Sequence, residues 1–231
     1  MDVPHGSVGC FFTLPLFDAW EVTGEKKYLD AAIKAYTFYY DEFHRSGVTT
    51  AGALDSFCID KESAAPILRS AMRCYHITGD KKYVAQAEEI AYYLVTWQWH
   101  YTVDFPKDSL CAQMGYDTFG STSVSAAHNA LDPYGIYWVP EYLELAELTG
   151  NPVWRSRARA LWYNGVECIS DGTAVVNGRV RPVGCQDESM RHTRWGRTDM
   201  RYFVPAEWFT SWQGVFRQVA LEMLDNWDVL R

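Results

Sequence analysis

The sequence lacks the short motifs that mark many enzyme classes. Its 231 residues contain no Gly-rich phosphate loop, no nucleophile elbow and no HExxH zinc motif. The six cysteines include no CxxC pair, which is typical of free thiols, although one or two disulfides remain open. No thiolate ligands have the tight spacing of a metal site. We therefore predict no metal and no cofactor.

The chain also lacks an excess of positive charge and a long apolar run. A net charge of −8 argues against general nucleic-acid binding. No segment approaches the roughly 18 apolar residues of a membrane-spanning helix, so we expect no membrane partner. Residues 1–5 show neither the basic region nor the apolar core of a signal peptide. We expect a soluble protein, and its location stays open, with periplasmic or extracellular placement if a leader preceded this chain.

Aromatic residues are abundant by contrast. They make up 16% of the chain, with 10 Trp and 15 Tyr. Such rings either fill a helical core or offer stacking platforms for flat ligands such as sugars, and composition favours the core. A chain of this length that is 48% hydrophobic can bury a full core, so we predict a single domain over residues 1–231.

One turn occurs three times in the same register. Ile77-Thr78-Gly79 is followed by Tyr83 and Ala87. The glycine suits the left-handed position that ends a helix, and the aromatic and the alanine lie four residues apart, on one face of the next helix. Each copy therefore predicts the tip of an αα-hairpin. The other copies are Val22-Thr23-Gly24 with Tyr28 and Ala32, and Leu148-Thr149-Gly150 with Trp154 and Ala158.

The connections between these hairpins are long, whereas the turns within them are short. In a stack of parallel hairpins the short turns fall on one face and the long connections on the other. Long ordered loops are usually functional, so we expect the site on the long-loop face. Val-Val-Asn-Gly-Arg-Val within 174–181 predicts a β-hairpin there. The predicted hairpins are 11–44, 62–99 and 132–167, with a last helix over 205–226 and long connections at 45–61, 100–131 and 168–204.

Hairpins closed by such Thr-Gly turns, with long loops opposite, resemble the (α/α) toroids of the six-hairpin glycosidase superfamily. That group includes unsaturated glucuronyl hydrolases, and some polysaccharide lyases share the toroid. The resemblance covers three hairpins and the last helix, and it implies an all-α fold and a carbohydrate-active enzyme. A complete toroid of that family has twelve helices, so the resemblance also implies that this chain is an incomplete arc or the C-terminal part of a larger catalytic domain.

Carboxylates on the long-loop face are the candidate catalytic groups, because glycoside cleavage commonly uses one carboxyl as acid and another as base or nucleophile. Asp60, Glu62 and Asp132 each precede a predicted helix, where capping alone favours an acid. Asp187 and Glu188 follow the β-hairpin, where capping explains them less well. The candidate catalytic residues are Asp60, Asp132, Asp187 and Glu188, and Asp117 lies on the same face.

His128 stands four residues before Asp132. If 125–132 is helical, the two share a face and form an oriented acid–base pair, although a lone His is more often structural. His128-Asn129 would also suit a lyase, which needs a base and a group to neutralise a carboxylate.

The third long loop is locally basic and aromatic. Arginine forks bind carboxylate or sulfate, and the interleaved rings suit sugar faces, so an acidic-sugar site is one interpretation. The other is that these arginines pair with Asp187, Glu188 and Asp199. The candidate substrate-binding residues are His128, Arg191, His192, Arg194, Trp195, Arg201, Trp208 and Trp212.

These observations together predict a glycoside hydrolase domain acting on an oligosaccharide or polysaccharide, including substrates with uronic acid. The alternatives are a polysaccharide lyase, a sugar epimerase with His128 and His192 paired, and a non-catalytic helical-repeat binding module. The open ends of an incomplete arc would expose apolar surface, so we expect them to be covered by a second copy, by further N-terminal helices or by the arc closing on itself. The residues at these ends are Phe11, Phe12, Leu16, Phe17 and Trp20, and Phe209, Trp212, Phe216 and Leu224.

Overall fold

The computed structural model describes residues 6–50, 58–128, 130–176, 178–191, 204–205 and 212–230. These residues form two compact units, each of which is described by itself. Unit 1 comprises 1–97, 125–127 and 141–152, and unit 2 comprises 98–124, 128–140 and 153–231.

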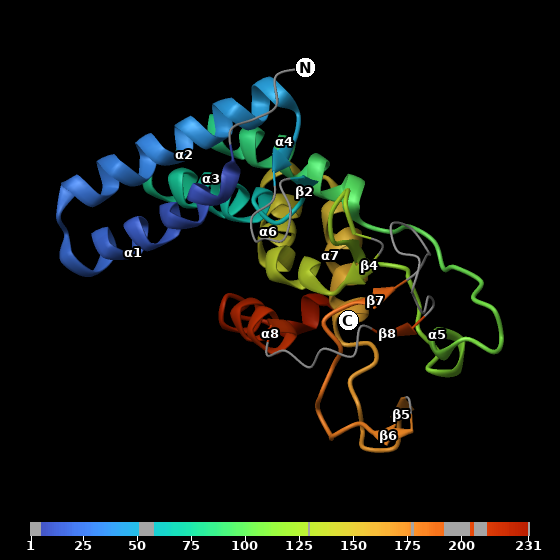
Figure 1. Ribbon diagram of the computed structural model, residues 1–231. Coiled ribbons are helices and arrows are strands. Elements are labelled where there is room, and N and C mark those ends of the chain that lie inside the picture. The colour runs from blue at the N-terminus through green and yellow to red at the C-terminus, as the bar shows by residue number, and fades with distance from the viewer. Residues whose placement is uncertain are drawn as a thin grey trace. The chain divides into compact units, whose positions relative to one another are not determined.

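Unit 1 is built from helices that follow one another as hairpins (Figure 1). A 3-10 helix leads into the first hairpin, and two short antiparallel strands lie between the first hairpin and the second. Most of helix α6 completes the unit. The elements are η1 (Ser7–Phe12), α1 (Thr13–Thr23), α2 (Lys26–Ser46), β1 (Thr49–Thr50), β2 (Ile59–Asp60), α3 (Ala64–Thr78), α4 (Lys82–Trp97) and α6 (Val139–Thr149).

The structure explains why threonine precedes glycine in the repeated turn. In every copy the threonine hydroxyl donates to the carbonyl four residues earlier and accepts from the N–H two residues later. For Thr78 these bonds reach Cys74 O at 2.7 Å and Asp80 N at 3.2 Å. Gly79 follows with φ of +71°, the left-handed conformation that glycine adopts without strain. The three predicted hairpin tips are confirmed.

The helices of unit 1 form two layers. Arg69 of α3 pairs with Glu141 of α6, and Arg73 of α3 lies 3.1 Å from Asp18 of α1, so the first helices of the hairpins contact one another. The second helices α2 and α4 do the same through tyrosine hydroxyls. Those bonds are Tyr36 to Gln86 at 2.7 Å and Tyr40 to Glu89 at 2.6 Å.

Two of the long connections meet in unit 1, as the hairpin pattern predicts. Asp60 forms a β-bridge with Ser125, and the Ala126 amide donates to the Ile59 carbonyl at 2.9 Å. Two further hydrogen bonds hold the contact between these connections. The Thr49 hydroxyl and the Tyr93 hydroxyl both donate to the Asp60 carbonyl, at 2.6 and 2.5 Å.

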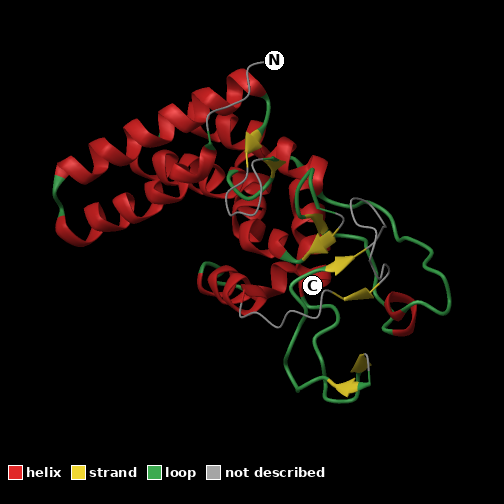
Figure 2. Cartoon of the chain, in the orientation of Figure 1, coloured by secondary structure: helices red, strands yellow, loops and turns green. Residues whose placement is uncertain are grey.

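Unit 2 combines helices with short strands, which Figure 2 colours yellow. Four of its strands form one antiparallel sheet in the order β3-β4-β7-β8. The elements are α5 (Leu110–Gln113), β3 (Thr122–Ser123), β4 (Ala130–Asp132), η2 (Tyr134–Trp138), α7 (Pro152–Gly165), β5 (Val175–Val176), β6 (Arg179–Val180), β7 (Met190–Arg191), β8 (Val204–Pro205), α8 (Trp212–Glu222) and η3 (Trp227–Leu230).

The all-α class and the inserted β-hairpin are confirmed, with β5 and β6 paired across Gly178. One local prediction is wrong at its start. The helix predicted over 205–226 does not begin at Pro205, which lies in β8; within the described residues it is α8. The condition that 125–132 is helical is not met either, since residues 130–132 form β4, which pairs with β3 on one side and β7 on the other.

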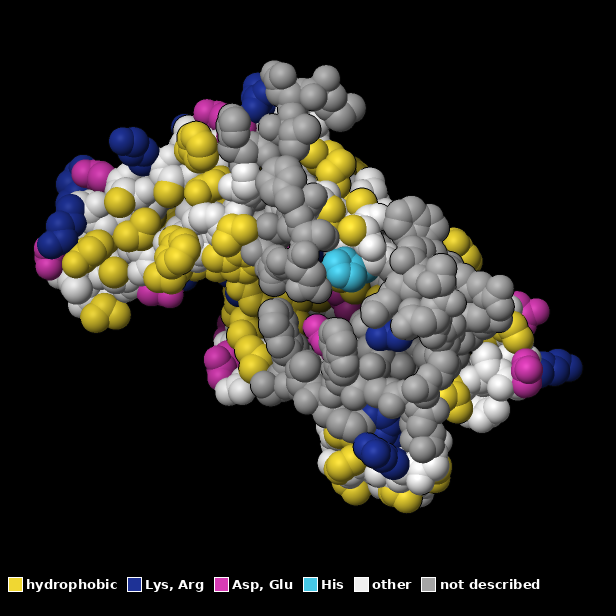
Figure 3. All heavy atoms as spheres, viewed as in Figure 1, with side chains coloured by type: hydrophobic (Ala, Val, Ile, Leu, Met, Phe, Trp, Pro, Cys, Tyr) yellow, Lys and Arg dark blue, Asp and Glu magenta, His cyan; other side chains and the backbone are white. Residues whose placement is uncertain are grey.

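The aromatic residues divide between core and surface. Trp138 and Trp154 are almost fully buried, whereas Phe12 is 71% exposed. Figure 3 shows apolar side chains on the visible surface of the α1–α2 hairpin. Phe17, expected at an open end, is buried in the fold, and covering by a second copy remains a prediction. No helix in the described residues is both long and apolar enough to cross a membrane.

Candidate functional site

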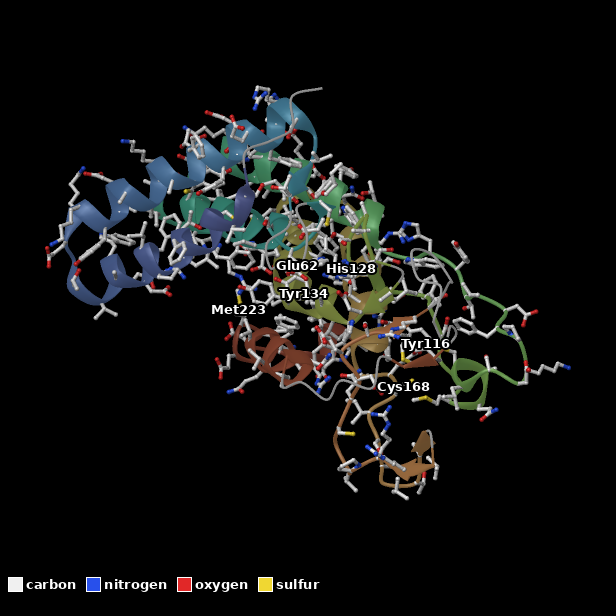
Figure 4. All side chains as sticks on the ribbon, viewed as in Figure 1. Glu62, Tyr116, His128, Tyr134, Cys168 and Met223 are labelled. Carbon is white, nitrogen blue, oxygen red and sulfur yellow. The ribbon has the colours of Figure 1, made fainter. Side chains whose placement is uncertain are left out.

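Unit 2 contains a pocket of about 270 Å3, counted up to its open mouth. Figure 4 labels two of the lining residues, Tyr116 and Cys168. The full lining is Tyr116, Leu131, Pro133, Asn164, Glu167, Cys168, Gln186, Asp187, Ser189 and Met190.

The apolar side of the pocket comes from the central strands and a neighbouring loop. Leu131 of β4 lies directly opposite Met190 of β7. Both belong to a buried cluster with Phe105, Cys111 and Tyr116. Because side chains alternate along a strand, Met190 faces this cluster and Arg191 points to the opposite face of the sheet.

The polar side begins where α7 ends. Glu167 lies in the turn after this helix, and Cys168 follows with φ of +55°, a left-handed conformation that is uncommon for a residue with a side chain. The last carbonyls of the helix are capped from outside it. Gln186 Nε2 donates to Gly165 O at 3.2 Å and to Glu167 O at 2.6 Å, and Arg217 Nη1 donates to Gly165 O at 3.1 Å. These bonds fix the backbone that carries Glu167.

The Glu167 carboxyl is half-buried and meets an amide and another acid. The Asp117 N–H donates to Glu167 Oε2 at 3.0 Å. Burial raises the pKa of Glu167 to about 7, and the nearby Asp117 charge adds to the rise while the amide bond opposes it. Among the described residues Glu167 has no cationic partner. A carboxyl of this kind carries a proton at neutral pH for much of the time.

Asp187 is the second carboxyl of the pocket. It is almost fully buried, and its Oδ1 lies 3.1 Å from Arg181 Nη2. Gln213 of α8 donates to its backbone carbonyl, also at 3.1 Å. Burial raises the pKa of Cys168, which lines the same pocket, to about 12, and the charges of Glu167 and Asp187 add to the rise. The pocket therefore combines a carboxyl that holds a proton with one whose charge a buried arginine balances.

The structure places one of the four predicted catalytic residues, Asp187, in this pocket. Glu188 is the next residue in the chain but is not part of the lining. Asp132 Oδ1 accepts from the Thr122 hydroxyl at 2.5 Å and from the Tyr134 amide at 3.2 Å, so local bonds hold this carboxyl next to the start of η2. Asp60 is buried in β2 of unit 1.

The predicted acid–base pair of His128 and Asp132 is wrong in its geometry. The pair depended on a helix, and His128 instead precedes β4 in a loop. Half-buried Arg191 lies in β7. Of the other predicted substrate-binding residues, His192, Arg194, Trp195, Arg201 and Trp208 lie outside the described residues, as does the side chain of Trp212.

Sequence reasoning missed Glu167, whose carboxyl has a raised pKa. Its signal was position, since the third predicted hairpin ends at this residue and a long connection starts at Cys168. Asn164 and Gln186 were missed because nothing in the sequence shows which carbonyls they contact. No group of three or more His, Cys, Asp or Glu in the described parts of the chain could hold a metal ion.

The fold and the pocket define a protein of αα-hairpins in which two carboxyls, those of Glu167 and Asp187, line one pocket. No protein-family model and no curated protein sequence matches the chain. Among solved structures it is similar to a selenomethionine derivative of the GH76 α-mannanase of Bacteroides thetaiotaomicron, with a TM-score of 0.44 and 19% identity. The match covers 69% of this chain and 43% of that enzyme, so the chain spans less than half of the enzyme's length.

Proposed function

We propose that this chain is part of a glycoside hydrolase in which Glu167 and Asp187 are the carboxyl pair. The observation that carries the proposal is the pairing of two differently tuned carboxyls in one pocket. Glu167 has a pKa of about 7, raised by burial, and Asp187 faces Arg181. Environments that separate two carboxyls in this way assign the acid and the base of a glycosidase.

The chemistry follows from these states. Glu167 donates its proton to the glycosidic oxygen as the bond to the sugar breaks, and charge on the sugar ring develops next to the Asp187 carboxylate. If Asp187 is the nucleophile, water then cleaves the glycosyl–Asp187 bond and gives its proton to Glu167. If Asp187 instead takes the proton of the attacking water, exchange with solvent removes that proton and returns one to Glu167. The apolar wall of Tyr116, Leu131 and Met190 excludes bulk water from one side of the reacting bond.

The proposal extends to the assembly and the substrate. The chain would be the C-terminal part of a toroid whose remaining helices come from elsewhere, and its substrate an oligosaccharide or polysaccharide. The assay below distinguishes substrates with uronic acid from neutral ones. The basic 191–201 segment is the candidate for binding the uronate carboxylate.

The experiment is a hydrolysis assay with aryl glycosides and with neutral and uronate-containing oligosaccharides, on this chain and on any longer native chain. We expect release of reducing sugar, and a loss of roughly 10²- to 10⁴-fold in kcat for Glu167→Gln at pH 7. Asp187→Asn is expected to lose at least as much.

The matched control is Glu144→Gln in unit 1, a carboxylate 2.5 Å from His76 on a neighbouring helix. It changes the same chemical group outside the pocket and should keep wild-type activity. Hydrolysis that survives both pocket substitutions would reject the assignment of the pair, and bond cleavage with formation of an unsaturated sugar would favour the lyase instead.

A further inference from the structure

Glu167 is held by a loop that supplies both a hydrogen bond and a charge. Asp117 belongs to this loop, and its backbone N–H donates to Glu167 Oε2 at 3.0 Å. The Asp117 carboxylate points elsewhere, because its Oδ1 accepts from the Thr102 hydroxyl at 2.6 Å and from the Phe119 amide at 2.8 Å. One residue thus fixes Glu167 through its backbone and influences it through its side-chain charge.

The loop is itself anchored to α7. Asn164 is almost fully buried and its Nδ2 donates to the Asp117 carbonyl at 2.8 Å. Gly120 lies so close to the same helix that a Cβ there would come within 2.1 Å of Ala160 O. Asn164 and Glu167 are three residues apart, so the end of α7 that precedes Glu167 also binds the loop that orients its carboxyl.

We infer that Asp117 is a positioning residue that selects Oε1 of Glu167 as the proton-bearing oxygen, and that Asn164 keeps it in place. A neutral carboxyl has one oxygen that accepts and one that carries hydrogen. Since Oε2 accepts the Asp117 amide, the proton belongs on Oε1. The inference rests on the proposed function for its catalytic meaning, because Oε1 is then the atom that protonates the leaving group.

Other charged and titratable groups around Glu167 act on it from different elements. Tyr116 lies on the same loop side, Cys168 is next in the chain, and Asp187 lies across the pocket. Arg217 of α8 binds the Gly165 carbonyl two residues earlier. Asp117 differs from all of these in touching the carboxyl itself.

Two substitutions separate this role from ordinary structural support. Asp117→Asn keeps the backbone N–H that binds Glu167 and a side-chain acceptor for Thr102 and Phe119. It removes the negative charge, so the pKa of Glu167 should fall. Asn164→Leu keeps the side-chain volume but releases the loop, and loss of the amide bond should raise the pKa of Glu167. Simple loosening would expose the carboxyl and lower its pKa in both variants.

The measurement is the titration of Glu167 by 13C NMR of labelled Glu carboxyls, assigned with Glu167→Gln, in variants whose folding is checked by thermal melts. We expect shifts of opposite sign, a parallel shift in the alkaline limb of kcat/KM, and roughly a 10- to 100-fold loss of kcat for Asn164→Leu with little change in KM. Shifts of the same sign, or none, would overturn the inference. Opposite shifts in a protein that cleaves no glycoside would support the positioning role and reject the proposed function.

If Asn164→Leu does not fold, Asn164→Asp replaces it. A further negative charge facing the Asp117 carbonyl should again raise the pKa of Glu167, and a fall in that pKa would contradict the positioning role.

Discussion

Glu141 of unit 1 and Glu167 of unit 2 are carboxyls in opposite surroundings. In unit 1 the buried Glu141 meets the guanidinium of Arg69, and the half-buried Glu144 lies 2.5 Å from His76. In unit 2 the half-buried Glu167 meets an amide and the charge of Asp117. Paired acids stabilise a scaffold, whereas an acid without a cation is destabilised as an anion and is kept ready to hold a proton. The comparison therefore separates an acid whose charge is balanced, as that of Asp187 is by Arg181, from one that is not, and under the proposed function the second is the reacting acid.

The largest expected effect is on the unfolding free energy, when the Arg69–Glu141 pair of unit 1 is broken. Arg69→Met leaves Glu141 buried without its partner, which should cost about 3–5 kcal/mol of unfolding free energy. Chemical denaturation measures the loss. Glu141→Leu added to Arg69→Met should restore much of it, and Lys26→Ala, which breaks an exposed pair, should change stability by less than about 0.5 kcal/mol. An Arg69→Met variant as stable as the wild type would show that the pair does not support the fold.

A smaller effect on stability, which depends on pH, should come from Glu167 in unit 2. The pKa of Glu167 is raised from an ordinary 4.5 to about 7, so the folded state binds this proton more tightly than the unfolded state. Its contribution to stability is complete below about pH 4.5 and is lost as pH rises through about 7. Glu167→Gln should therefore be more stable than the wild type at pH 8, by on the order of 1–2 kcal/mol after allowance for partial exposure.

Melting curves from pH 4.5 to 8 measure this difference. Glu42→Gln is the control that should show no such growth, because its partner Arg45 stays charged over this range. A difference between Glu167→Gln and the wild type that stays constant with pH would contradict the raised pKa.

The smallest effect tests the repeated turn. Thr78→Val removes both hydroxyl bonds at the tip of the second hairpin, and we expect a loss of about 1 kcal/mol. Thr78→Ser keeps the hydroxyl and should lose less. Equal melting temperatures for the Ser and Val variants would mean that the hydroxyl bonds contribute nothing to the turn.

The hairpins could be predicted from sequence because their signals are local. The Thr-Gly pair and the aromatic-alanine spacing act within about ten residues, and the structure adds only the reason for the threonine. The sheet could not be predicted in this way. Its strands have two or three residues each, and β4 is defined by partners at Thr122 and Met190 rather than by its own sequence.

The site shows the same division. Asp187 was a candidate because an acid after a β-hairpin has no capping role to explain it. Glu167 was not, since its pKa is raised chiefly by burial in the folded chain, which the residues around it in the sequence do not show. The His128–Asp132 pair failed because helix propensity in an alanine-rich stretch yielded to strand pairing on both sides.

The most direct test of the account is the leaving-group dependence of Glu167→Gln. An acid catalyst matters most when the leaving group is a poor one, so the variant should be severely impaired on an oligosaccharide or a phenyl glycoside of the preferred sugar. On a dinitrophenyl glycoside of that sugar, which needs no proton, it should recover close to wild-type kcat, and the alkaline limb of the wild-type pH profile should disappear. Equal impairment on both substrates, with the limb unchanged, would contradict the assignment of Glu167 as the acid.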